Sequence, residues 1–249
     1  MGRKLIIAGG SSGIGLALAQ GLHAQDSTGE LEIVTISRRE EHPAAALVKQ
    51  HIAADLSAGR EAVQAAVAQA GEVLGGAVNG LVYCPGSINL RPFDRLSDAD
   101  FQNDWQLNFM GAVHSAQAAL PLLKAGAEQG KASQLLFFST LAVQTGFPYH
   151  ASVSGAKGAR EGLTRALAAE LAPLIAVNAI APGLPETPLA ERLLKSESQR
   201  KGATERSPLK SIMTAPEVAA MAIPLLMAEQ PPTTGQIFAL DGGASAVRV

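Results

Sequence analysis

The sequence lacks the features that mark several large classes of protein. Its 249 residues contain a single cysteine, Cys84, which excludes an intrachain disulfide and a cysteine-rich metal site and is typical of a reducing compartment. The first apolar run, residues 5–8, ends at a glycine and is too short for a signal peptide or a membrane span. We therefore expect a cytoplasmic protein with no membrane partner.

Net charge is also nearly absent. The chain has 20 Lys and Arg residues against 22 Asp and Glu residues, so no broad electrostatic field favours nucleic acid as a partner. Four histidines lie on different predicted elements without carboxylates at ligand spacing, which predicts surface or packing roles and no metal site; they are His23, His42, His51 and His114. The expected partner is a small-molecule substrate.

The chain does contain a regular alternation of short apolar runs and longer alanine-rich stretches. This is the pattern of β-α-β units on a parallel sheet that is buried on both faces. The predicted strands are residues 4–8, 31–37, 77–84, 134–139, 176–180 and 236–239, with a further short strand ending near Asp55, and the predicted helices are residues 13–23, 60–70, 98–124, 152–171 and 215–227. No linker or repeat interrupts the alternation, so the sequence predicts an α/β fold with a doubly wound parallel sheet, in which residues 1–249 form a single domain.

A glycine-rich segment, Gly9-Gly10-Ser11-Ser12-Gly13-Ile14-Gly15, follows the first predicted strand. Glycines at such a place let the backbone turn tightly and approach a pyrophosphate at the N-terminus of the next helix. A glycine cluster alone also fits a plain strand-to-helix turn. The candidate cofactor-binding residues of this segment are Gly9, Ser11, Ser12, Gly13 and Ile14.

The second predicted strand ends in Ser37-Arg38-Arg39 and carries no carboxylate there. An acid at this point would bond the 2′-hydroxyl of an adenosine ribose, whereas a hydroxyl and a guanidinium suit a 2′-phosphate. Ser37 and Arg38 therefore favour NADP(H) over NAD(H) as the cofactor. The alternative is that the two arginines are solvated surface residues.

Taken in order, these segments resemble the short-chain dehydrogenase/reductase family. The spacing of Gly9, Gly13 and Gly15 is the Gly-x-x-x-Gly-x-Gly form of that family, and residues 54–56, 177–183 and 234–243 resemble its later motifs. The resemblance implies a Rossmann fold, a nicotinamide cofactor and a homodimer or homotetramer paired through alanine-rich faces of residues 112–119 and 156–169. It adds further cofactor-binding residues: Asp55, Leu56, Gly86, Lys157, Pro182, Gly183 and Thr187.

The likeness is weaker where the fourth predicted strand ends. The family has Asn-Asn-Ala-Gly at this point, and the chain has Tyr83-Cys84-Pro85-Gly86, of which only the glycine matches. Cys84 is either a reactive thiol or a small packing residue. Residues 184–212 follow the sixth strand, where relatives place a mobile helix pair that covers the substrate and excludes water.

The resemblance also implies a catalytic set of Asn, Ser, Tyr and Lys. Asn108 matches the family's Asn, which holds a water on the proton path, and Thr140 stands at the Ser position, where its hydroxyl can bond a substrate carbonyl. Lys157 matches the Lys that bonds the nicotinamide ribose. The Tyr is missing, because its place, four residues before the Lys, is taken by Val153, whose side chain cannot exchange a proton.

Two neighbours offer a replacement for the missing phenol. They are Tyr149 and His150, and His150 lies seven residues before Lys157, which is the Tyr position in the related enoyl carrier-protein reductases. Imidazole titrates near neutrality and can donate a proton to a substrate oxygen. The alternative is that both residues only line a pocket or cap the following helix.

Two functions remain open at this point. The first is an NADP(H)-dependent oxidoreductase that acts on a small carbonyl, alcohol or enoyl substrate, with Asn108, Thr140 and Lys157 retained and His150 as the substitute acid. The second is a nucleotide-binding protein that has lost catalysis and acts as a sensor or subunit. The retained Asn and Lys favour the enzyme, and Val153 favours the alternative.

Overall fold

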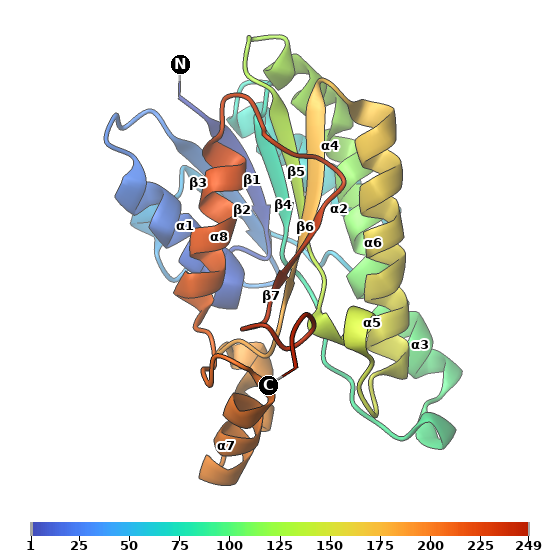
Figure 1. Ribbon diagram of the computed structural model, residues 1–249. Coiled ribbons are helices and arrows are strands. Elements are labelled where there is room, and N and C mark those ends of the chain that lie inside the picture. Colours follow the sequence, from blue (N-terminus) through green and yellow to red (C-terminus); the bar gives the residue numbers. More distant parts are fainter. Residues whose placement is uncertain (1, 249) are drawn as a thin grey trace.

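The strands of the described residues run parallel in one seven-stranded sheet (Figure 1). The computed structural model describes residues 2–248. Its strands are β1 (Lys4–Ala8), β2 (Glu32–Ser37), β3 (Gln50–Ala53), β4 (Gly80–Tyr83), β5 (Ser133–Phe138), β6 (Ile175–Pro182) and β7 (Ile237–Leu240), in the order β3-β2-β1-β4-β5-β6-β7. The predicted doubly wound α/β fold is confirmed.

Helices cover both faces of the sheet. One face carries α1 (Gly13–Gln25) and α8 (Ala215–Met227), and the other carries α2 (Arg60–Val73), α4 (Gly111–Ala127) and α6 (Ala151–Leu171), as Figure 1 shows. Each face encloses its own cluster of buried apolar side chains. This is why the strands read as unbroken apolar runs: β5, for example, is buried at every residue.

The carboxyl ends of the strands, at the lower end of Figure 1, are surrounded by shorter elements. These are α3 (Asp98–Trp105), α5 (Leu141–Thr145), the 3-10 helix η4 (Pro188–Leu193) and α7 (Glu197–Arg206). The sheet order reverses at β1, which lies between β2 and β4, and ligands of open α/β sheets bind at such a point. The helix pair expected within residues 184–212 is formed by η4 and α7.

The helix expected over residues 98–124 is interrupted. A π-helical turn, η3 (Gln106–Met110), separates α3 from α4 and has Asn108 at its centre. In this wider turn the carbonyl of Leu107 accepts a hydrogen bond from Tyr83 Oη at 2.8 Å, and that of Asn108 accepts one from Arg160. Side chains thus satisfy carbonyls in this turn, and such π-helical turns are common at functional sites.

Two further short 3-10 turns, η1 (Ala45–Leu47) and η2 (Phe93–Arg95), complete the described elements. Within residues 2–248 we find no helix both long enough and apolar enough to cross a membrane.

Candidate active site

A cleft of about 560 Å³ opens between the glycine-rich segment and the ends of β2 and β4. We call it the glycine cleft. Most of the predicted cofactor-binding residues line it: Gly9, Ser11, Ser12, Gly13, Ile14, Ser37, Arg38, Asp55, Leu56, Gly86 and Thr187. The structure therefore brings together residues that are far apart in the sequence.

The backbone of the glycine-rich segment fits a pyrophosphate. Gly9 and Gly13 have φ of 79° and 52°, a conformation that favours glycine. Ser12 precedes the first turn of α1 and makes no side-chain capping bond, so the backbone N–H groups there are left for a ligand. A Cβ on Gly15 would lie 2.3 Å from the Gly9 carbonyl oxygen, so only glycine allows this close packing of helix and loop. These residues fit a dinucleotide.

Side chains at the end of β2 form the other end of the cleft. Ser37 Oγ donates to Ser11 Oγ at 2.7 Å and ties this strand end to the glycine-rich segment. Arg38 and Asp55 both line this end of the cleft, and the pKa of Asp55 is lowered mainly by hydrogen bonds from Ser57 and further by the Arg38 charge. His51, one of the histidines assigned to surface or packing roles, is half-buried and bonds the Arg39 carbonyl at 2.9 Å.

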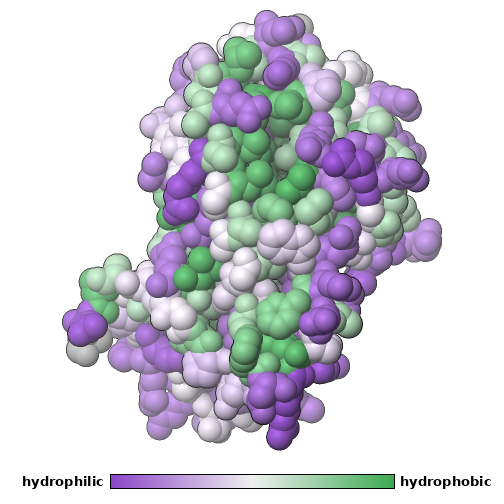
Figure 2. Space-filling view, turned by 90° about the vertical axis from the view of Figure 1, so that its right-hand side faces the viewer, coloured by the Kyte–Doolittle hydropathy of each residue, from purple (hydrophilic) through white to green (hydrophobic). Residues whose placement is uncertain are grey.

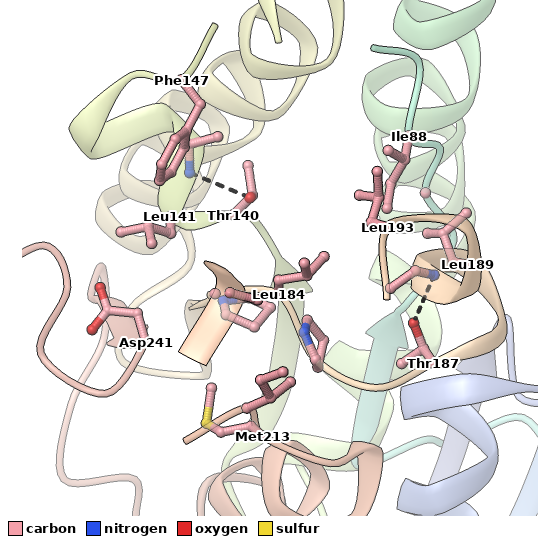
Figure 3. A pocket seen from close by; sticks show the side chains of 18 of the residues that line it. Ile88, Thr140, Leu141, Phe147, Leu184, Thr187, Leu189, Leu193, Met213 and Asp241 are labelled. Atoms are coloured by element: carbon pink, nitrogen blue, oxygen red, sulfur yellow. Dashed lines mark hydrogen bonds between the residues drawn. The ribbon is translucent and has the colours of Figure 1, made fainter. Parts of the chain in front are cut away.

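A second pocket, of about 400 Å³, adjoins the glycine cleft (Figure 3). We call it the apolar pocket, because most of the side chains labelled in Figure 3 are apolar: Ile88, Leu141, Phe147, Leu184, Leu189, Leu193 and Met213. Leu189 and Leu193 come from η4, so the segment after β6 lines this pocket. The two cavities share the residues Ile14, Cys84, Gly86, Thr187 and Leu189.

Three of the four predicted catalytic residues line the apolar pocket, namely Thr140, His150 and Lys157, and so do Pro182 and Gly183. Thr140 Oγ1 accepts the Ala142 N–H at 3.3 Å and caps α5 (Figure 3), which leaves the hydroxyl proton free to be donated. Val153 lines the same pocket and is 4% exposed.

Of the two candidate substitutes for tyrosine, only His150 lines one of the two cavities. His150 lines the apolar pocket, packs against Phe147 and pairs Nδ1 with the Pro148 carbonyl oxygen at 2.8 Å. A carbonyl can only accept, so Nδ1 carries a proton and Nε2 of the neutral ring is unprotonated. Tyr149 is 58% exposed and is not among the residues that line either cavity.

Asn108 is fully buried behind the pocket in a polar network that the sequence did not reveal. Its Nδ2 donates to Ser87 Oγ at 2.6 Å, and Ser87 and Ser152 both donate to Asp104, each at 2.5 Å. Asp104 and Asn108 lie one turn apart on the same helical stretch, whereas Ser87 and Ser152 come from two distant segments, so no local pattern predicts the whole network. The network fixes the π-helical turn against α6.

Gly86 lies where this network meets Lys157. A Cβ on Gly86 would be 3.2 Å from Asn108 Oδ1 and 3.5 Å from Lys157 Nζ. Burial, and then the charge of Arg160, lower the pKa of Lys157 to about 7, while Asp104 acts in the opposite direction. Burial also raises the pKa of the Cys84 thiol to about 12, which supports a packing role for Cys84.

The chain matches known proteins over nearly its whole length. A family model described as enoyl-(acyl carrier protein) reductase covers residues 8–245. A tropinone reductase homologue of Arabidopsis thaliana is 31% identical over 98% of this chain and 91% of its own. The chain belongs to the short-chain dehydrogenase/reductase family.

Solved structures of this family agree. A short-chain dehydrogenase/reductase of Brucella melitensis is 29% identical with a TM-score of 0.86, covering 98% of this chain and 97% of its own. An actinorhodin polyketide ketoreductase, solved with NADPH, is 26% identical with a TM-score of 0.87, covering 99% and 98% of the two chains. The protein is thus an oxidoreductase of the short-chain dehydrogenase/reductase type, and the fold implies a nicotinamide nucleotide. These matches do not favour the nucleotide-binding alternative.

Proposed function

We propose that the protein is an NADPH-dependent reductase of apolar carbonyl or enoyl compounds. The observation that carries this proposal is the junction of the two cavities, since the glycine cleft suits a dinucleotide and the apolar pocket opens directly from it. Arg38 beside Ser37 supports the 2′-phosphate form of the nucleotide, since no carboxylate stands at this strand end.

Different residues of the chain bind the nucleotide and contact the substrate. The glycine-rich segment and Arg38 would hold the nucleotide, and Thr187, which lines both cavities, and Lys157, which lines the apolar pocket, would hold its nicotinamide end. When bound, the nicotinamide supplies the hydride. The Thr140 hydroxyl can donate a hydrogen bond to the substrate oxygen, and leucines of η4 help to exclude water.

The test is a turnover assay with NADPH and with NADH over matched panels of apolar ketones, enoyl thioesters and polar sugars. We expect consumption of NADPH with the apolar compounds and little with the sugars. The matched variant is Leu193→Asp, which places a charge in the apolar pocket and is expected to raise KM while nucleotide affinity holds. A preference for NADH, or for the sugars, contradicts the proposal.

A further inference from the structure

The helix that carries Lys157 buries a second cation less than one turn further on. Arg160 is fully buried, donates from Nη1 to the Phe138 carbonyl at 2.7 Å and from Nη2 to the Asn108 carbonyl, and lies 5.1 Å from the centre of the Tyr83 ring. Within residues 2–248, no ion pair joins it to a carboxylate. Its charge is balanced only by carbonyl dipoles and an aromatic face.

Lys157 is equally short of a counter-ion. In the described part of the chain its Nζ has no hydrogen bond or ion pair, and its side chain lines the apolar pocket. The carboxylate of Asp104 is already held by the hydroxyls of Ser87 and Ser152. The amine is therefore directed to a ligand rather than to a partner in the protein.

Arg160 is fully buried and Lys157 is half-buried at the wall of the apolar pocket, so keeping both side chains charged is unfavourable. A guanidinium keeps its proton in proteins, so the like charge acts on the lysine and favours its neutral form. The pKa of Arg160 is lowered to about 10 by burial, which still leaves it charged at neutral pH. The other titratable groups around the pair are Asp104 on α3, Tyr83 and Cys84 at the end of β4, and His150 before α6.

We propose that Lys157 is the group that exchanges a proton with the substrate oxygen, and that Arg160 is a positioning residue that favours its neutral amine. This rests on the proposed reductase function. In reduction the Lys157 ammonium is the acid: one N–H bond breaks with its electron pair kept on nitrogen, which leaves the neutral amine. An O–H bond forms with an electron pair of the substrate oxygen as hydride adds to the carbon and the C=O π pair moves to that oxygen. In oxidation the neutral amine takes the hydroxyl proton. Val153 is short and apolar, so no side-chain hydroxyl at that position separates the amine from the substrate.

The first test needs neither cofactor nor turnover. NMR of isotope-labelled lysine side chains in the apoprotein follows each amine with pH, and the Lys157→Met variant assigns the signal. We expect Lys157 to titrate near neutrality and its midpoint to rise by about one pH unit or more in Arg160→Leu, because removing a like charge favours the ammonium. Arg160→Lys should restore part of the shift. The matched control is Arg165→Leu, which removes an exposed arginine of the same helix. It should leave the titration midpoint of Lys157 unchanged.

A wild-type midpoint near that of an ordinary lysine, or an unchanged midpoint in Arg160→Leu, overturns the role of Arg160. This outcome is independent of the proposed reductase function, because it is measured without substrate. If the midpoint behaves as expected and no panel compound is reduced, the reductase function fails and the Lys157–Arg160 coupling stands.

The second test follows the proton in turnover. Lys157→Arg keeps a cation that can hold nucleotide hydroxyls but does not titrate, so we expect nucleotide affinity close to wild type and a fall in kcat of about 10²-fold or more. The pH dependence of kcat should shift in Arg160→Leu as the NMR midpoint shifts. His150→Ala should leave that pH dependence unchanged. Loss of the titration in His150→Ala instead assigns the proton to His150 and overturns the proposal.

Discussion

Val153 lies in the wall of the apolar pocket, at the position where the resemblance to the family implies a tyrosine, and Thr140 and Lys157 line the same pocket. A valine at this position removes a hydroxyl and also removes volume, and the two effects are separable. The hydroxyl concerns the rate of proton transfer, and the volume concerns which substrates fit.

Val153→Tyr should therefore raise kcat for small ketones, by up to the 10² to 10⁴-fold range typical of general acid catalysis, because the phenol would point from α6 one turn before Lys157. Val153→Phe adds the same ring without the hydroxyl and is the matched control. Steady-state kinetics with NADPH on small and bulky ketones measures both effects. Equal rates in the two variants would show that the hydroxyl is irrelevant at this position.

At the end of β2, the side chain of Arg38 is expected to decide the preference between NADPH and NADH. Arg38→Asp replaces a guanidinium with a carboxylate beside the expected 2′-phosphate, so NADPH affinity should fall by about tenfold or more, about 1.4 kcal/mol, relative to NADH affinity. Fluorescence titration of both nucleotides measures the ratio. Arg95→Asp changes an exposed arginine outside both cavities and should leave it unaltered. An unaltered ratio in Arg38→Asp would assign Arg38 to the solvated surface.

At the scale of elements, the contact between α4 and the end of β4 positions the catalytic region. A Cβ on Gly111, the first residue of α4, would lie 2.2 Å from Tyr83 Oη and 2.5 Å from the Leu56 carbonyl oxygen. The helix can approach the sheet this closely only with glycine at this position. Tyr83 in turn bonds the π-helical turn that holds Asn108.

Gly111→Ala should lower the free energy of unfolding by about 1–3 kcal/mol, because overpacking forces α4 away from the sheet. The control is Gly202→Ala on α7, where an added Cβ meets no atom within 4 Å and alanine should stabilise the helix by about 0.5–1 kcal/mol. Denaturant unfolding of both variants gives the comparison. A neutral Gly111→Ala would mean that the contact relaxes freely.

Local patterns account for what the sequence predicted and what it missed. The strands and the glycine cradle depend on neighbouring residues, so periodicity and the glycine spacing located them. The π-helical turn was not predicted from the sequence, because its carbonyls are satisfied by Tyr83 and Arg160, which come from distant segments. One signal was present in the sequence: Arg160 follows Val153 and Lys157 at seven and three residues, which places a charged side chain on a buried helix face.

At the scale of the whole molecule, one side remains more apolar than a solvated surface requires. Figure 2 looks onto the side that carries α6, and a band of hydrophobic side chains runs between hydrophilic margins. On α6 the small residues Gly162, Ala166 and Ala169 are exposed. We propose that this side pairs with a second copy of the chain around a two-fold axis.

Light scattering at micromolar concentration should give a dimer or tetramer for the wild type. Ala166→Glu, which places a charge on the exposed α6 face, should shift the protein toward monomer. Ala24→Glu introduces the same charge on α1, which lies on the opposite face of the sheet. This variant should keep the oligomeric state of the wild type. A monomeric wild-type protein would contradict the pairing.

The small side chain at Val153 also has a pharmacological consequence. A relative with tyrosine at this position fills the space beside Lys157 with a phenol ring, whereas the apolar pocket here has only a valine wall. We expect an inhibitor with a bulky apolar group directed at that wall to fit this pocket, and to collide with the phenol in an enzyme that has tyrosine at this position. The same residue that removes the family's proton donor thus offers a handle for a selective chemical probe.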